Sequence, residues 1–126
     1  MSKVVINTSN APAPIGPYNQ AVKAGNFLFC SGQIALDAQS GALVNDSIEA
    51  ETHQVMKNIA AILTAAGAGF EHIVKTTIFL SDMSLFATVN ETYGSYFTAD
   101  FPARETVAVK GLPKNVNVEI SVTAFL

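Results

Sequence analysis

The stretch FPARETVAVKGLPKNVNVEI, residues 101–120, holds the only arginine of a chain whose other basic residues are six lysines. From Ala103 to Lys110, residues alternate in a way that predicts a strand with Arg104 and Thr106 on one face. After a turn segment with glycine and proline, residues 116–125 alternate again and predict a second strand. Local features would make the two strands a C-terminal hairpin. The last strand is, however, apolar on both faces toward its end, which suits a central position in a sheet better than an edge.

Arg104 and Glu119 are the first site candidates. The guanidinium of Arg104 is a planar fork that can hold a carboxylate through two hydrogen bonds, which lysine does less well. Glu119 is the only ionisable side chain of the final strand, and an unpaired charge in an apolar layer is costly. The residues alone leave two alternatives open: a structural salt bridge between Arg104 and Glu119, or a site in which the carboxylate does chemistry.

Several motifs along the chain carry a resemblance to one family. They are IGPY (15–18) followed by QA (20–21), SGQI (31–34), VKTT (74–77), Phe86 with Asn90 and Tyr93, PAR (102–104) with Val107 and Leu112, and VEI (118–120). With these motifs the whole chain resembles the YjgF/YER057c/UK114 family, also called RidA. The order of the motifs makes the resemblance much more specific than any one of them.

Two residues depart from the family pattern. The family usually has a small residue after the arginine, where this chain has Glu105, and many members have a cysteine at the position of Thr106. By strand alternation Glu105 faces away from Arg104, so it need not neutralise the guanidinium. Thr106 keeps a hydroxyl that can donate and accept, whereas any role that needs a thiolate would be lost.

The remaining elements are expected as follows. Gly25-Asn26 predicts a hairpin between strands at 20–23 and 27–31, a helix is expected from Asp46 or Ser47 to Gly67, a strand over 73–80, and a second helix over 83–98. This order, without repeats, predicts a single α+β domain, residues 1–126, with two helices on one face of a sheet. The resemblance implies a chorismate-mutase-like sandwich on a mixed sheet, with the last strand inserted in that sheet. It also implies a trimer with pockets between neighbouring subunits, so that Arg104 and Glu119 of one pocket can come from different chains.

The composition excludes some classes of protein. Charged residues make up 13% of the chain, against about 25% in an average soluble domain, so we expect an oligomer interface to bury the surplus apolar surface. No apolar run approaches the roughly 18 to 20 residues of a membrane span. The net charge of −3 and the absence of tryptophan argue against a nucleic-acid partner. One cysteine and two scattered histidines give no metal spacing, and with no signal peptide a reducing cytoplasm is expected.

Three more residues are candidates for the site. Tyr18 is carried by the proline-rich loop SNAPAPIGPYNQ, where its ring either caps a pocket or packs on the core, and the resemblance favours the pocket. Gly32 ends a strand, where its backbone can approach a ligand. Asn90 falls on the expected buried stripe of the second helix, where the amide either caps a backbone group or, as the resemblance favours, reaches a pocket.

Cys30 and His53 are expected to lie outside the site. Cys30 is part of the apolar run FLFC and has no histidine beside it, which indicates an inert buried thiol. His53 falls among polar residues of the first helix and indicates a solvated face.

The resemblance implies the activity. Arg104 would clamp a small carboxylate, and Glu119 would position or deprotonate a water. Tyr18, Gly32, Asn90 and Thr106 would shape the rest of the pocket. This set suits hydrolysis of 2-imino acids such as 2-iminobutanoate and 2-iminopropanoate to 2-keto acids and ammonia, which would clear the reactive products of pyridoxal-phosphate dehydratases. Because the imine is already an activated electrophile, neither metal nor cofactor is expected.

Two other functions stay open at this level. A non-catalytic trimer could use Arg104 to bind small keto acids as a sensor or partner protein, and Glu119 would then matter little. A ribonuclease or translation inhibitor has also been proposed within the family. The acidic net charge and the lack of a histidine pair argue against that last function.

Overall fold

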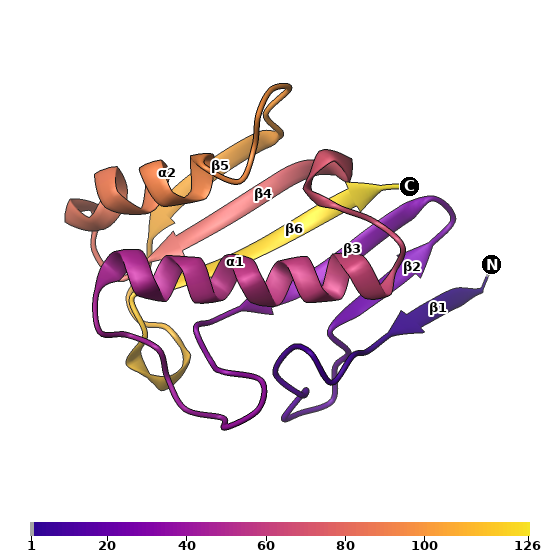
Figure 1. The fold of residues 1–126 in the computed structure, drawn as a ribbon, viewed down its shortest axis with the longest axis horizontal. Coiled ribbons are helices and arrows are strands. Elements are labelled where there is room, and N and C mark those ends of the chain that lie inside the picture. Colours follow the sequence, from indigo (N-terminus) through magenta and orange to yellow (C-terminus); the bar gives the residue numbers. More distant parts are fainter. Residues whose placement is uncertain (1) are drawn as a thin grey trace.

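The computed structural model describes residues 2–126 as one mixed sheet with two helices on one of its faces (Figure 1). The strands are β1 (Lys3–Ile6), β2 (Ala21–Ala24), β3 (Phe27–Gln33), β4 (Ile73–Leu80), β5 (Ala103–Ala108) and β6 (Val118–Phe125), and the helices are α1 (Ile48–Ala65) and α2 (Phe86–Gly94). The strand order is β1-β2-β3-β6-β4-β5. Among the neighbouring strands of residues 2–126, only β4 and β5 run parallel to each other. The predicted α+β class is confirmed.

The C-terminal strand β6 is central in the sheet, between β3 and β4. The local prediction of a C-terminal hairpin is therefore wrong, whereas the inserted strand implied by the resemblance is confirmed. One face of β6 carries Val118, Ile120 and Val122, all buried beneath the helices, and its other face is mostly half-buried. Two such faces suit a central strand better than an edge.

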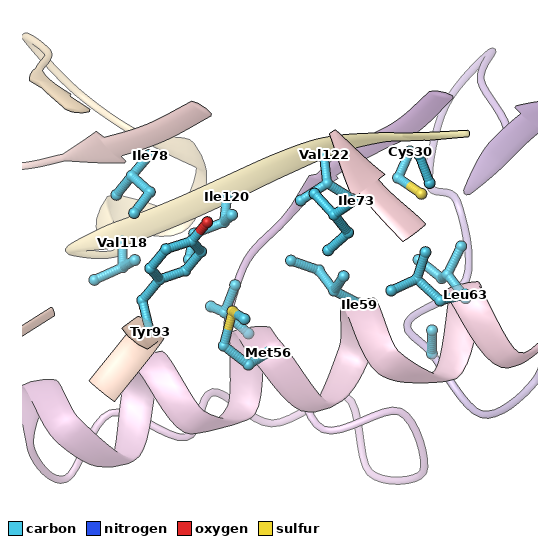
Figure 2. Close-up of a cluster of buried hydrophobic side chains, with 14 of the residues drawn as sticks. Cys30, Met56, Ile59, Leu63, Ile73, Ile78, Tyr93, Val118, Ile120 and Val122 are labelled. Atoms are coloured by element: carbon cyan, nitrogen blue, oxygen red, sulfur yellow. The ribbon is translucent and has the colours of Figure 1, made fainter. Parts of the chain in front are cut away.

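Helix α1 begins and ends where its sequence predicts. Ser47 caps the helix by accepting a hydrogen bond from the backbone N–H of Ala50 (3.0 Å), and Gly67 follows the last turn with a φ of 77°. The apolar stripe of α1, including Met56 and Ile59, packs onto the buried face of the sheet (Figure 2). This contact forms the main core.

Helix α2 is shorter than the predicted segment 83–98. A single 3-10 turn over Met83–Leu85 precedes it, and the helix ends at Gly94, a residue of low helix propensity. The chain then turns, and the rings of Tyr96 and Phe97 pack against Phe70 with centroid separations of 5.3 and 5.8 Å. Burial of these rings competes with continuation of the helix and ends it early.

The sheet face opposite the helices, called the open face below, carries exposed aromatic rings. Phe27, Phe29 and Phe125 are 43%, 50% and 46% exposed. Further along the same face, Glu105 pairs with Lys75 at 3.1 Å and accepts a hydrogen bond from Thr77. Glu105 thus faces away from Arg104, as strand alternation predicts. No helix within residues 2–126 has the length and apolar character needed to cross a membrane.

Candidate active site

Arg104 lies on the edge strand β5 and projects to the helix side of the sheet. It pairs in register with the buried Thr76 of β4, whose Oγ1 accepts a hydrogen bond from the Tyr93 hydroxyl of α2 (2.9 Å). The guanidinium donates to Asn90 Oδ1 at 2.7 Å, and its central carbon lies 5.4 Å from the ring centre of Tyr93 and 5.7 Å from that of Phe86. Two rings and one amide therefore hold the cation in place.

The rest of the arginine fork remains available to a ligand. Arg104 is exposed and lines a hollow with Asn90, Phe101 and Pro102, and its one hydrogen bond occupies one side of the guanidinium. A planar fork with free donors suits a carboxylate.

Asn90 is exposed, so the prediction of a buried position is wrong. The reason is that α2 buries only Val89, Thr92 and Tyr93, and Asn90 lies at the border of that stripe. Sequence reasoning also missed Phe86 and Tyr93 as the rings under the arginine. Their spacing from Asn90 along one helix face, four residues before and three after, was the available signal.

Thr106 follows Arg104 on the same face of β5. Its Oγ1 is buried and has no hydrogen-bond partner within residues 2–126. An unsatisfied buried hydroxyl costs free energy. Thr106 does not line the hollow beside Arg104, whose walls are formed by Asn90, Phe101 and Pro102 among others. We group Arg104, Asn90 and Thr106 as the arginine cluster.

Glu119 projects from the opposite face of the sheet. It pairs with Phe79 of β4, whereas Arg104 pairs with Thr76, and residues of odd spacing along a strand face opposite sides. The ion pairs found across residues 2–126 include neither Arg104 nor Glu119. The hypothesis of a structural salt bridge between these two residues of one chain is therefore wrong.

Glu119 borders a cavity of about 490 Å³, called the Glu119 cavity below. Tyr18 and Gly32 line it, as do Ile15 and Lys114, two residues that sequence reasoning did not single out. Gly32 lies in a bulge of β3, and a Cβ at this position would overlap the Glu119 carboxylate. Glycine is thus required for the approach of Glu119 to the strand.

Burial shifts the chemistry of Glu119. Desolvation raises the pKa of its carboxyl group above the ordinary value of 4.5. A carboxyl group with a raised pKa in a cavity is a better proton acceptor from water than an exposed one.

Cys30 and His53 lie outside both groups. Cys30 is 6% exposed, which confirms that its thiol is buried, and burial raises the pKa of this thiol to about 12, as expected for an unreactive one. His53 Nδ1 lies 2.6 Å from the Tyr96 hydroxyl on the outer side of the helices. Among residues 2–126 there is no group of three or more His, Cys, Asp or Glu side chains that could hold a metal ion.

The six predicted site residues therefore form two separate groups. Arg104, Asn90 and Thr106 lie on the helix side at β5, whereas Tyr18, Gly32 and Glu119 surround the Glu119 cavity. Within one chain these groups do not share a pocket.

The fold and the two groups of residues define a small α+β protein with an exposed arginine that keeps free donors and a cavity lined by a carboxyl group. The family model described as endoribonuclease L-PSP matches residues 8–126. A RutC family protein of Pyrococcus horikoshii is 51% identical over 123 residues, which is 98% of this chain and 98% of the relative. A human protein named 2-iminobutanoate/2-iminopropanoate deaminase is 47% identical over 121 residues, 96% of this chain and 88% of the relative.

A solved structure agrees with the family model and with these relatives. A crystal structure of a Yersinia pestis protein of the conserved Rid family matches with a TM-score of 0.97 at 48% identity and covers 99% of this chain and 100% of that one. The chain belongs to the RidA family, which confirms the resemblance found in its motifs.

Proposed function

We propose that this protein is an enzyme that hydrolyses 2-imino acids, among them 2-iminobutanoate and 2-iminopropanoate, to 2-keto acids and ammonia. Membership in the RidA family and the name of the human relative support the deaminase role. The activity would remove reactive imines and enamines released by pyridoxal-phosphate dehydratases before they attack other enzymes.

The observation that carries this proposal is Glu119, a carboxyl group with a raised pKa that faces a cavity and has no cationic partner within residues 2–126. In the proposed reaction Glu119 accepts a proton from water while the water oxygen bonds to the imine carbon. That proton then passes to the nitrogen and completes a carbinolamine. A second proton, from the new hydroxyl group, moves to the nitrogen through the Glu119 carboxylate while the C=O bond forms and the C–N bond breaks, so that ammonia leaves and the keto acid remains. The imine carbon is already electrophilic, so the reaction is expected to need neither metal nor cofactor.

Arg104 supplies the binding half of the proposed site. Its free donors would hold the substrate carboxylate bidentately, with Asn90 and the two rings fixing the guanidinium. The Thr106 hydroxyl and the Tyr18 ring would complete the pocket. Orientation of the carboxylate sets the imine carbon against the water.

The proposal includes a homotrimer of chorismate-mutase-like arrangement with shared pockets. The exposed aromatic rings of the open face and the low content of charged residues support burial of that face between subunits. Because Arg104 and Glu119 project from opposite faces of one sheet, one subunit would contribute the arginine cluster and its neighbour the Glu119 cavity. A cytoplasmic location stays a prediction.

The test is direct. A dehydratase acting on threonine generates 2-iminobutanoate in situ, and formation of 2-ketobutanoate is followed with and without the protein. We expect the protein to exceed the buffer rate. Cys30→Ser is the control for an intact fold, since its buried thiol is remote from the chemistry, and it should keep full turnover with somewhat lower stability.

The alternatives make different claims. A sensor trimer would bind 2-ketobutanoate through Arg104 yet leave the rate of imine hydrolysis at the buffer value. A ribonuclease, the activity after which the family model is named, would cleave RNA. The net charge of −3 does not favour RNA binding.

A further inference from the structure

The Glu119 cavity is bounded by three segments that lie in loops or at the ends of strands. The first wall is the loop 8–18, which carries Ile15 and Tyr18. The second is segment 31–36, where β3 ends and the chain leaves the sheet, and the third is segment 112–117, which holds Lys114. Such segments keep one shape only if something besides a strand ladder or a helix holds their main chain.

The first wall is held by the side chain of Gln20, which is 1% exposed. Its Nε2 lies within hydrogen-bond distance of the carbonyl oxygens of Thr8 (3.0 Å), Ala11 (3.2 Å) and Pro12 (2.8 Å), and its Oε1 accepts from the Thr8 N–H (2.6 Å). Prolines in this loop remove backbone donors, so the loop cannot satisfy its carbonyl groups internally. One buried amide takes over that role.

The second wall is held by Asn58 of α1, also 1% exposed. Its Nδ2 donates to the carbonyl oxygens of Ile34 (3.0 Å) and Leu36 (2.9 Å), and its Oδ1 accepts from Gln54 Nε2 (2.9 Å). The amide thus ties the helix to the chain directly after β3.

The third wall is held by Glu51, which lies about two turns before Asn58 on the same face of α1 and is fully buried. Its carboxylate accepts hydrogen bonds from the backbone N–H groups of Asn117 (2.8 Å) and Val118 (3.0 Å) and from Asn117 Nδ2 (3.0 Å). Val118 immediately precedes Glu119, so Glu51 fixes the backbone that carries the proposed base.

Burial of polar side chains is not explained by stability alone, because apolar residues of similar size would serve a core as well or better. The other buried polar residues of α1 and β4 bond within their own helix, as Thr52 does to Ile48, or support the arginine cluster, as Thr76 does. Gln20, Glu51 and Asn58 instead reach the main chain of three different walls of one cavity.

We propose that Gln20, Glu51 and Asn58 are positioning residues that hold the three walls of the Glu119 cavity in a preformed arrangement. The kinetic effects expected from this positioning role rest on the proposed function, whereas the arrangement of the walls does not. The first two walls surround the substrate, and their loosening weakens binding. Loosening of the third wall displaces Glu119 and slows the chemical step.

The test uses three exchanges that keep side-chain size: Gln20→Glu, Asn58→Asp and Glu51→Gln. Hydrogen exchange of backbone amides, read by mass spectrometry, should accelerate about tenfold or more in one wall per variant: 8–18, 31–36 and 112–118 respectively. The amides of β6 beyond its first residue should keep their parent rates.

The kinetic readout separates the walls. Gln20→Glu and Asn58→Asp should raise KM about tenfold with little change in kcat, and Glu51→Gln should lower kcat about tenfold with KM nearly kept. If a carboxylate at position 20 or 58 prevents folding, Gln20→Met and Asn58→Leu remove the same hydrogen bonds without adding a charge.

Val55→Thr is the matched control. Val55 lies on α1 between Glu51 and Asn58, is fully buried, has no side-chain polar atom to bond a wall and does not line the cavity, so a threonine there should lower the melting temperature and leave wall exchange and KM unchanged. Equal acceleration of exchange across β6 and all walls, or the same KM change in Val55→Thr, would overturn the proposal. A parent without deaminase activity would defeat the proposed function, while wall-specific exchange would still support the positioning role.

Discussion

Arg104 and Glu119 are prepared for a ligand in different ways. The guanidinium is supported by Asn90 and two rings and keeps donors free, so it is built to bind. The Glu119 carboxyl group has no partner among the ion pairs of residues 2–126, and its pKa is raised by burial, so it is suited to accept a proton. Loss of the two side chains should therefore have different effects.

Arg104→Ala should abolish useful binding of the imino acid and of the keto-acid product alike. A charge-assisted contact contributes about 1.5 to 3 kcal/mol, which corresponds to roughly ten- to hundredfold in affinity, and Arg104→Lys should restore little because lysine lacks the planar fork. Titration calorimetry with 2-ketobutanoate measures this. Parent-like affinity in Arg104→Ala would place the carboxylate elsewhere.

Glu119→Gln should keep keto-acid binding and lose on the order of a hundred- to ten-thousand-fold in turnover, the usual cost of removing a general base. In the parent the base must be ionised, and its pKa lies above 4.5, so kcat should fall as pH falls through that raised pKa. Rates corrected for the buffer reaction at each pH give the profile. Full activity in Glu119→Gln would leave the enzyme standing but remove this carboxylate from the mechanism.

Among the helices and strands, sequence periodicity predicted those boundaries that depend on local sequence. The boundaries of α1 follow from Ser47 and Gly67, and the β4 strand over 73–80 follows from its pattern. The early end of α2 could not be predicted from its pattern, because it depends on the packing of Tyr96 and Phe97 against the distant Phe70.

The residue alternation of a strand likewise does not show which strands pair with it. The central position of β6 was predicted from the apolar character of both its faces toward its end and from family resemblance, and its place between β3 and β4 in particular is not given by alternation, which is the same in a hairpin and in a central strand. The opposite orientations of Arg104 and Glu119 depend on the register of β4 with both β5 and β6, which no local feature encodes. The candidate residues were thus predictable, and their separation into two groups was not.

The bulge of β3 at Gly32 gives a prediction about the packing of β3 on Glu119 of β6. Gly32→Ala places a Cβ where the Glu119 carboxylate lies, so either β3 or the carboxylate must move. We expect turnover to fall about a hundredfold while the arginine cluster and keto-acid binding through Arg104 persist. Gly111→Ala is a matched control, because a Cβ there meets no atom within 4 Å. Equal turnover in the two variants would contradict the close packing of Gly32 on Glu119.

For the whole molecule, the open face is the feature that a single chain leaves unexplained. Its aromatic residues Phe27, Phe29 and Phe125 are between 43% and 50% exposed, and charged residues are too few to cover the surface. We expect a homotrimer, and sedimentation equilibrium at micromolar concentration should give three times the chain mass. A monomer mass would remove both the trimer and the shared pocket.

The central claim is that one subunit supplies Arg104 and its neighbour supplies Glu119 to the same pocket. The most direct measurement mixes inactive Arg104→Ala and Glu119→Gln proteins, dissociates and reassembles them together, and follows 2-ketobutanoate formation from 2-iminobutanoate. In equal mixtures about a quarter of the interfaces join an intact Arg104 to an intact Glu119, so activity should return to roughly a quarter of the parent value. If each chain supplied both residues to its own pocket, no mixed assembly would contain an intact site, and activity that stays at the buffer rate would contradict the account.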